Sequence, residues 1–267
     1  MKKRFGQHFL TDSSILRRIV QLAEIRPEDT VVEIGPGAGS LTRVLAASAK
    51  RVIAIEIDKD LIPQLRSSAP ANVDIIEGDA LVIPFPGDPF HLVGNLPYNI
   101  ATPLFKRFID GRRTILDVTV MIQKEVAERL RAKPGAGEYG PLSVLIQYYA
   151  TVRYGFKVSP GAFKPPPRVD SAVVRLEWKQ DVPDARPFTD FVHRAFGSRR
   201  KKLVNNLVSM FGSLGREELL RRMRDSGISV DARPEELSVA EFLRVYNQLH
   251  ERSECKRDSA QPSIKDE

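Results

Sequence analysis

Between residues 30 and 123 the sequence alternates short apolar runs with amphipathic runs, and this alternation constrains the fold more than any other feature. The β-branched, apolar runs predict strands, and apolar residues spaced three or four apart predict helices. We expect strands at 30–34, 51–57, 73–76, 90–93 and 119–123, with helices at 40–49, 60–67 and 103–110 between them. Strands and helices that alternate in this way form a mostly parallel sheet covered on both faces, so the predicted fold class is α/β.

The second half of the chain has a different pattern. A helix is expected at 142–147, and two antiparallel edge strands are expected at 151–158 and 172–178. The three consecutive prolines in SPGAFKPPPRVDS, residues 159–171, indicate a stiff, extended loop between those strands. Only helices are expected later, at 188–196, 201–210, 216–225 and 239–249. We therefore predict a first domain at 1–180, a small all-α domain at 181–250 and a disordered tail at 251–267, which lacks apolar periodicity.

Charge and cysteine content limit the partners and the compartment. Lys and Arg number 41 against 34 Asp and Glu, and the net charge of +7 favours a polyanionic partner such as nucleic acid. The one cysteine, Cys255, excludes a disulfide framework and a cysteine-based zinc site, and no metal site is expected. No apolar run approaches the roughly 20 residues that cross a bilayer, and no signal-peptide core follows the basic start MKKRFGQHFL. We expect a cytoplasmic protein without a membrane partner.

A glycine-rich turn, EIGPGAG at residues 33–39, joins the first predicted strand to the first predicted helix. Gly35 and Gly37 allow a ligand to approach the backbone, and the helix start offers free N–H groups. The nicotinamide-dinucleotide fingerprint places its third glycine at the sixth position, where this chain has Ser40. The turn therefore predicts a ligand that differs from such a dinucleotide, and a tight turn without a ligand is the alternative.

Acidic residues end the next two predicted strands. Glu56 is placed where a carboxylate can accept hydrogen bonds from both hydroxyls of a ribose. Asp79, or the amide of the neighbouring Ala80, can reach an adenine edge. Each acid alone is equally compatible with a solvated sheet edge. Because three successive strand ends line one crevice in an open α/β sheet, together they predict a nucleoside cofactor.

The segment VGNLPYN, residues 93–99, ends the fourth predicted strand beside that crevice. The amide oxygen of Asn95 and the carbonyl of Leu96 can accept hydrogen bonds from an exocyclic amine, and the ring of Tyr98 can stack on the base that carries the amine. The alternative is a helix-entry turn, formed by Asn95 and Pro97, in which the tyrosine only packs. The functional interpretation is a site that holds an adenine amine towards a cofactor.

Seven segments resemble the family of ribosomal RNA adenine N6,N6-dimethyltransferases and cover nearly the whole chain. They are FGQHFLTD (5–12), EIGPGAGSLT (33–42), AIEID (54–58), EGDAL (77–81), GNLPYNIATPL (94–104), FKPPPRVDSAVVRL (163–176) and AFGSRRKKLVNNL (195–207). Macrolide-resistance methyltransferases share the first five kinds of motif, whereas the last two favour the small-subunit enzymes. Where many members have Asn, this chain has His8; either side chain can hydrogen-bond, so no loss of function is expected.

The resemblance implies a Rossmann-like class I methyltransferase domain with a seven-stranded, mostly parallel sheet. It also implies S-adenosyl-L-methionine as cofactor and dimethylation of two adjacent adenines near the 3′ end of small-subunit rRNA, within a pre-30S particle, by a monomeric enzyme of ribosome biogenesis. The implied cofactor contacts are Gln7, His8, Leu10, Gly35, Gly37, Glu56, Asp79, Ala80 and Asn95. The implied catalytic residues are Asn95, Leu96, Pro97 and Tyr98, with Phe163 sandwiching the target base opposite Tyr98.

A basic run is expected to contact RNA through Arg199, Arg200, Lys201 and Lys202, and a solvated helix face is the alternative. Residues 181–267 carry a net charge of only +1, so the RNA footprint is expected to span both domains. Two other functions stay open at this point. One is a large-subunit rRNA or DNA adenine methyltransferase, and the other is a non-catalytic RNA-binding assembly factor. Glu56 and the intact residues 95–98 argue against the second.

Overall fold

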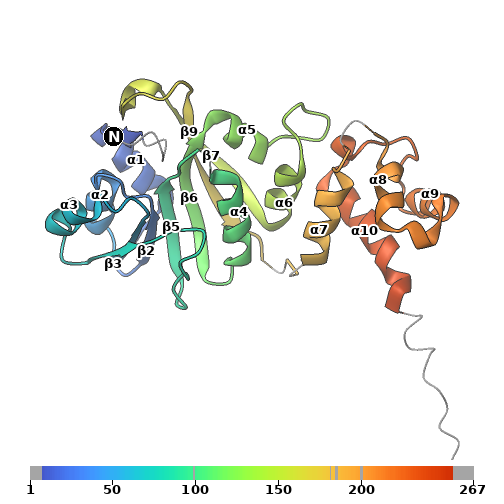
Figure 1. The fold of residues 1–267 in the computed structure, drawn as a ribbon, viewed down its shortest axis with the longest axis horizontal. Coiled ribbons are helices and arrows are strands. Elements are labelled where there is room, and N and C mark those ends of the chain that lie inside the picture. The colour runs from blue at the N-terminus through green and yellow to red at the C-terminus, as the bar shows by residue number, and fades with distance from the viewer. Residues whose placement is uncertain (1–7, 99, 181, 184–185, 199–200, 255–267) are drawn as a thin grey trace, which may run out of the picture. The chain divides into compact units, whose positions relative to one another are not determined.

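The computed structural model describes residues 8–98, 100–180, 182–183, 186–198 and 201–254. Its main feature is a seven-stranded sheet in the order β4-β3-β2-β5-β6-β9-β7 (Figure 1). The strands are β2 (Thr30–Ile34), β3 (Arg51–Glu56), β4 (Val73–Glu77), β5 (Phe90–Asn95), β6 (Ile115–Gln123), β7 (Ala150–Val158) and β9 (Ser171–Trp178).

The first five of these strands run parallel, and β9 lies antiparallel between β6 and β7. From β2 the chain first builds outward through β3 and β4, and then returns to add β5 on the other side of β2. This reversal creates a topological switch point, and open α/β sheets bind ligands outside the carboxyl ends of the strands at such a point. The sheet order therefore places the expected site beside β2 and β5.

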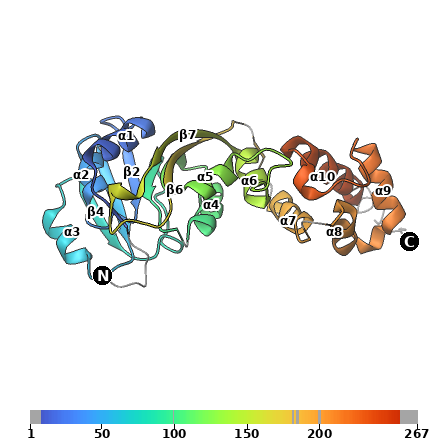
Figure 2. The same cartoon turned by 90° about the horizontal axis from the view of Figure 1, so that it is seen from above.

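The sheet is buried on both faces because apolar residues occupy successive positions of its central strands. Val31 and Val32 of β2 are both fully buried, as are Val52 and Ala54 of β3. Helices flank the sheet in Figures 1 and 2: α1 (Ser13–Ala23), α2 (Ser40–Ala46), α3 (Ile62–Ser68), α4 (Ala101–Asp110) and α5 (Lys124–Leu130). Asp12 caps α1 by accepting from the backbone N–H groups of Ser14 and Ile15. Burial on both faces explains the continuous apolar runs in the sequence.

A second, two-stranded sheet joins segments that are far apart in the chain. Strand β1 (Phe9–Leu10) pairs antiparallel with β8 (Phe163–Lys164), which follows the short helix η2 (Pro160–Ala162). The backbone N–H of Thr11 extends the pairing by donating to the Ala162 carbonyl at 3.0 Å. The start of the described chain is therefore fixed to the proline-rich loop.

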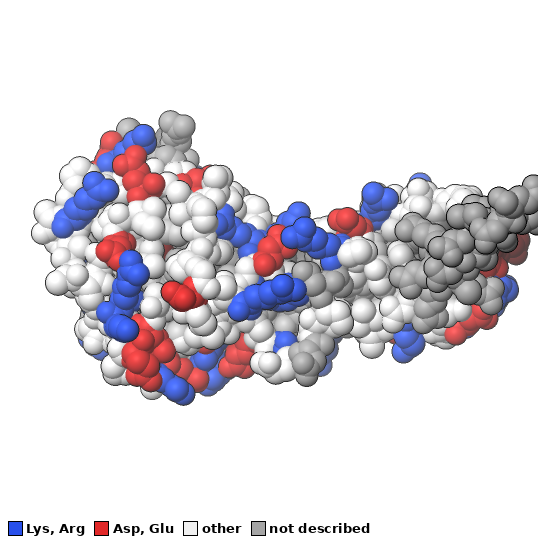
Figure 3. Space-filling model, turned by 90° about the horizontal axis from the view of Figure 1, so that it is seen from below, with Lys and Arg blue, Asp and Glu red and all other residues white. Residues whose placement is uncertain are grey.

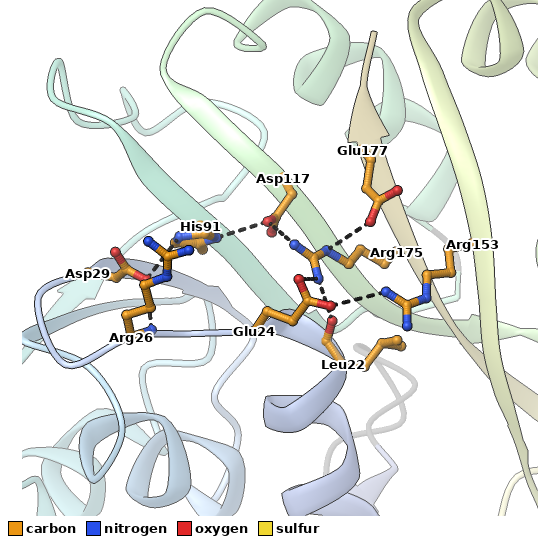
Figure 4. A network of polar contacts seen from close by, with 9 residues as sticks. All are labelled: Leu22, Glu24, Arg26, Asp29, His91, Asp117, Arg153, Arg175 and Glu177. Carbon is orange, nitrogen blue, oxygen red and sulfur yellow. Dashed lines mark hydrogen bonds and ion pairs between the residues drawn. The ribbon is translucent and has the colours of Figure 1, made fainter.

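An ionic network lies at the amino-terminal edge of the large sheet, where its parallel strands begin (Figure 4), and its central residues His91, Asp117 and Arg175 are buried. His91 lies between Asp117 and Asp29, at 3.0 and 3.2 Å. Arg175 contacts the same oxygen of Asp117 at 2.8 Å and also contacts Glu24 at 2.7 Å. Because Glu24 is the C-cap of α1, the network ties that helix to strands β5, β6 and β9.

The chain divides into two compact units, residues 1–131 with 149–181 and residues 132–148 with 182–267. The second unit contains the first eight residues of α6 (Pro141–Tyr149), together with α7 (Arg186–Ala195), α8 (Leu203–Met210), η3 (Gly212–Leu214), α9 (Arg216–Asp225), η4 (Pro234–Glu236) and α10 (Val239–Glu254). Aromatic rings of α6, α7 and α10 form its core, with Tyr148 and Phe188 4.8 Å apart and Phe188 and Tyr246 5.4 Å apart.

Three features differ from the sequence-based expectations. Residues 132–148 were expected in the first domain but belong to the second unit, because the Tyr139 hydroxyl donates to the Leu237 carbonyl at 2.7 Å and Tyr148 packs on Phe188. Helices α1 and α5 are not among the expected elements. Helix α10 continues through residues 251–254 of the predicted tail, and residues 255–267 lie outside the described part. Among the described residues, none of the helices combines the length and apolarity that crossing a bilayer requires.

Candidate active site

A cavity of about 270 Å³ opens at the carboxyl ends of β2, β3, β4 and β5. The segment from His8 to Leu10 contributes to its wall, so β1 covers the ends of the strands. Eleven of the predicted site residues line this cavity: His8, Leu10, Gly35, Gly37, Glu56, Asp79, Ala80, Asn95, Leu96, Pro97 and Tyr98. The fold thus brings together residues from five separate motifs.

The glycine-rich turn needs its glycines for conformational reasons. Gly35, Gly37 and Gly39 have φ values of +70°, +57° and +76°, a left-handed region that side chains disfavour. A Cβ at Gly37 would also lie 2.9 Å from the ring of Phe9. The turn can therefore bend tightly under β1 while its backbone lines the cavity.

Glu56 is 3% exposed, and each of its carboxylate oxygens accepts one backbone hydrogen bond. Gly37 N–H donates to Oε2 at 3.0 Å, and Asp58 N–H donates to Oε1 at 2.9 Å. Burial raises the pKa of Glu56, while these two N–H donors act in the opposite direction. A carboxylate has about four lone-pair sites, so two acceptor sites are left for a ligand diol.

Glu33 and Ile57 are among the cavity residues that received no role in the sequence analysis. Glu33 is 1% exposed, and its Oε2 has no hydrogen-bond partner among the described residues. Burial raises the pKa of Glu33 to about 8, and the charge of Glu56 acts in the same direction. Ile57 also lines the cavity and is 42% exposed. The sequence feature that could have indicated Glu33 is its acidic side chain within an otherwise apolar predicted strand.

Asp79 follows β4 and forms part of the cavity wall at the end of that strand. Its Oδ1 accepts from the backbone N–H of Leu81 at 2.8 Å, while its carbonyl accepts from Val82 and Ile83. These bonds fix the turn in which Ala80, 6% exposed, borders the cavity. The polar and small groups expected for contact with a base edge therefore lie on a rigid turn.

Asn95 and Leu96 present acceptors at the end of β5. The Asn95 Nδ2 donates to the His8 carbonyl at 3.0 Å, and this partner fixes which end of the amide is the oxygen. No donor among the described residues reaches Asn95 Oδ1 or the Leu96 carbonyl, while Leu96 N–H donates to Met121. Both oxygens are thus available to a ligand.

Tyr98 lies beside these acceptors with its hydroxyl anchored. The hydroxyl oxygens of Tyr98 and Ser171 are 2.7 Å apart, and Ser171 is fully buried at the start of β9. Burial raises the pKa of Tyr98, so the phenol stays neutral near pH 7. The ring of His8 also contacts the ring of Tyr98, with centroids 5.9 Å apart and an angle of 29° between the planes.

The other predicted site residues that the structure describes, Phe163, Lys201 and Lys202, do not line the cavity. Phe163 is 2% exposed, packs in the core cluster that includes Leu10, and is not among the residues that line the cavity. Lys201 and Lys202 are exposed in the second unit, and Lys202 pairs with Asp231 at 2.6 Å. Gln7, Arg199 and Arg200 lie outside the described residues.

The sheet order, with one antiparallel strand inserted next to the edge, and the cavity over the central strands define a class I methyltransferase. The sequence profile of the family described as "Ribosomal RNA adenine dimethylase" matches residues 1–251. The chain therefore belongs to the ribosomal RNA adenine dimethylase family.

Relatives and solved structures agree with this membership. A protein of Pseudomonas fluorescens named "Ribosomal RNA small subunit methyltransferase A" is 42% identical over 260 residues, which is 93% of each chain. A protein of the same name from Shouchella clausii is 41% identical over 266 residues, covering 94% of this chain and 90% of its own.

Two crystal structures resemble the fold over most of the chain. A dimethyladenosine transferase from Plasmodium falciparum gives a TM-score of 0.82 at 27% identity, covering 92% of this chain and 98% of its own. The 23S rRNA methyltransferase ErmE gives a TM-score of 0.68 at 28% identity, covering 90% and 99%.

Proposed function

We propose that this methyltransferase uses S-adenosyl-L-methionine to dimethylate the N6 amines of two adjacent adenines near the 3′ end of small-subunit rRNA, within a pre-30S particle. The observation that carries the proposal is a pair of available acceptors, Asn95 Oδ1 and the Leu96 carbonyl, beside an anchored aromatic ring in the cofactor cavity. An exocyclic amine has two hydrogens and belongs to a flat base, which matches this arrangement.

The cavity residues fit the cofactor chemically. Glu56 keeps two acceptor sites for the ribose hydroxyls, and Asp79 with Ala80 would border the adenine. Glu33 holds a proton in the free protein, and the positive charge of the cofactor would favour its ionised form, whose unpartnered, buried Oε2 can then accept a hydrogen bond. Gly35 and Gly37 permit close approach of the turn, and Leu10 would cover the ligand. When bound, the cofactor supplies an electrophilic methyl group.

Asn95 and Leu96 would act on the nucleophile. The lone pair of an adenine amine is delocalised into the ring, and accepting both N–H hydrogens favours a pyramidal nitrogen with a localised lone pair. The same two oxygens stabilise the positive charge that develops on nitrogen as the new N–C bond forms. One N–H proton then leaves to solvent. The monomethylated amine keeps one hydrogen, so one acceptor suffices for the second transfer.

Tyr98 and the hydrogen bonds that anchor the site would orient the target base. The ring of Tyr98 can stack on a base that has left its helix, which costs a few kcal/mol of unstacking. Because Ser171 fixes the Tyr98 hydroxyl and His8 fixes the Asn95 amide, ring and acceptor are held before the base arrives. Such preorganisation lowers the barrier without a dedicated general base.

The named relatives support the small ribosomal subunit over the alternatives. The curated relatives with about 40% identity carry a small-subunit name, whereas the 23S rRNA enzyme shares 28% identity. A non-catalytic assembly factor would not need two available acceptors beside Tyr98. The experiment is incubation with methyl-labelled S-adenosyl-L-methionine and either small or large ribosomal subunits that lack the modification. Label in the small-subunit rRNA supports the proposal, and label only in large subunits, or none, contradicts it.

RNA contacts are proposed for the basic run of Lys201 and Lys202 with Arg199 and Arg200. On the face drawn in Figure 3, Lys and Arg alternate with Asp and Glu, so no single-sign patch dominates that face. Because Asp231 already neutralises Lys202, we expect Lys201→Glu to weaken RNA binding more than Lys202→Glu. The log–log slope of affinity against salt should become shallower by about 1 in Lys201→Glu. An unchanged slope would assign the run to a solvated surface.

A further inference from the structure

Two rings meet at the position proposed for the target base. His8 and Tyr98 both line the cavity, with their centroids 5.9 Å apart and their planes 29° from parallel. Aromatic rings in direct contact have centroids about 4.5–7 Å apart. A base inserted between two parallel rings needs about 7 Å, which is twice a contact distance of roughly 3.5 Å. The His8 ring therefore covers Tyr98 and leaves no room for a base between them.

The two rings are held in different ways. Tyr98 is bonded through its hydroxyl to Ser171, which is fully buried in the large sheet. His8 is partly exposed and precedes the two-residue strand β1. Among the described residues its side chain has one hydrogen bond, in which Nδ1–H donates to the carbonyl of Pro165 at 2.8 Å. Displacing Tyr98 would strand a buried hydroxyl, whereas turning the imidazole exchanges one loop contact for water. The ring that can move is His8.

The backbone of His8 has a separate role. Its carbonyl accepts from Asn95 Nδ2, so the main chain must stay in place for the Asn95 oxygen to keep its orientation. Phe163, the ring expected opposite Tyr98, is buried and pairs with Leu10 across β1 and β8. Hence a change of the His8 side-chain rotamer alone would uncover the Tyr98 face.

We propose that the His8 imidazole is a placeholder for the target base: it covers Tyr98 in the free enzyme, and the incoming adenine replaces it by stacking on the same ring. The inference rests on the proposed function, because it takes Tyr98 as the ring that receives the base. In this proposal the His8 side chain competes with the base for the face of Tyr98, while the His8 main chain positions Asn95.

Two variants separate the ring from its anchor. His8→Asn removes the ring and keeps a donor for the Pro165 carbonyl, whereas His8→Phe keeps a ring and loses the donor. Steady-state methylation is measured on unmethylated small ribosomal subunits with saturating S-adenosyl-L-methionine. A placeholder predicts that KM for the subunits falls about fivefold in His8→Asn and does not fall in His8→Phe.

The outcomes are distinguishable. A KM that rises in His8→Asn would mean that the His8 ring stacks on the bound base. A KM that is unchanged, or equal in the two variants, would mean that the ring has no role in binding the base. Either result overturns the inference. Calorimetry of cofactor binding on both variants shows whether a kinetic change comes from the cofactor site, which would also overturn it. If wild-type enzyme labels no small-subunit rRNA, the proposed function fails and this inference fails with it. If wild-type enzyme is active and the variants match it, only the inference fails.

Discussion

At the amino-terminal edge of the sheet, the buried Asp117 contacts the basic side chains of His91 and Arg175. At the carboxyl edge, in contrast, the buried Glu33 and Glu56 both line a cavity. The pKa values reflect this difference. Burial opposes the charged form of His91, but the hydrogen bond and charge of Asp117 outweigh it and raise the pKa of His91. At the other edge burial raises the pKa of both glutamates.

The comparison separates residues that stabilise the fold, at the amino-terminal edge, from residues that are arranged to bind a ligand, at the carboxyl edge. Buried charges with counter-charges stabilise their arrangement, and removing one partner leaves an uncompensated charge. Buried acceptors without donors destabilise the free protein, and such groups are found at functional sites. We therefore expect changes at the amino-terminal edge to alter stability, and changes at the carboxyl edge to alter binding and rate.

The largest expected effect is at the amino-terminal edge. Asp117→Ala leaves His91 and Arg175 without their shared partner, and breaking a buried ion pair costs about 3–5 kcal/mol of unfolding free energy. Denaturant unfolding measures the loss. The control is Asp74→Ala, which breaks a pair with Arg51 whose side chains are 54% and 57% exposed, and should cost at most about 1 kcal/mol. Equal losses in the two variants would show that the network does not hold the fold.

At the carboxyl edge, Asn95→Ala removes one of the two acceptors proposed for the developing positive charge on nitrogen. We expect the single-turnover methylation rate, with both substrates saturating, to fall about 10²–10³-fold. The control is Asn72→Ala, because Asn72 donates to the carbonyls of Ala46 and Ala49 and does not line the cavity. That control should lose stability and keep its rate. An Asn95→Ala enzyme within about threefold of wild type would exclude the acceptor role.

Glu56→Gln should weaken cofactor binding at least about tenfold, because the amide keeps one acceptor oxygen and replaces the other with a donor. Glutamine is preferred to alanine, which would also leave the N–H groups of Gly37 and Asp58 without acceptors. Calorimetry with S-adenosyl-L-methionine measures the change. Glu77→Gln is the matched control, since Glu77 lies opposite Glu56 in the register of β4 with β3 but does not line the cavity. Similar affinities for the two variants would remove Glu56 from the site.

The last expected effect is gradual and appears as a slope of the unfolding free energy against pH, at most about 1.4 kcal/mol per pH unit for one group. Folded Glu33 holds its proton up to about pH 8, while in the unfolded chain it releases it near 4.5. Between these values the folded state binds more protons, so unfolding free energy falls as pH rises. Unfolding measured from pH 5 to 9 should show a flatter decline in Glu33→Gln than in wild type or Glu77→Gln. Parallel curves would contradict a neutral Glu33.

Local patterns in the sequence predict much of the carboxyl edge. Strand β2 has the predicted bounds, and Glu56, Asp79 and Asn95 come at strand ends, where parallel topology gathers them. The ends of strands can be predicted from the sequence because apolar runs stop at polar or glycine residues. The methyltransferase fold was confirmed by the sheet order and the structural relatives.

The amino-terminal edge and the cover of the cavity could not be predicted in this way. His91, Asp117 and Arg175 occupy ordinary strand positions, and their contacts depend on strand order. Pairing of β1 with β8 joins residues about 150 positions apart, and this pairing buries Phe163 and brings His8 to Tyr98. Helix α5 starts at Lys124, directly after the last residue of β6, so no turn signal marks it.

The central claim is that two acceptors hold an adenine amine so that both of its hydrogens can be replaced. It is tested most directly by nucleoside mass spectrometry of small-subunit rRNA after exhaustive reaction with wild-type enzyme and S-adenosyl-L-methionine. The account predicts N6,N6-dimethyladenosine at two adjacent positions, with N6-methyladenosine present only at early times. A reaction that stops at N6-methyladenosine, or that modifies a different atom of the base, would contradict it.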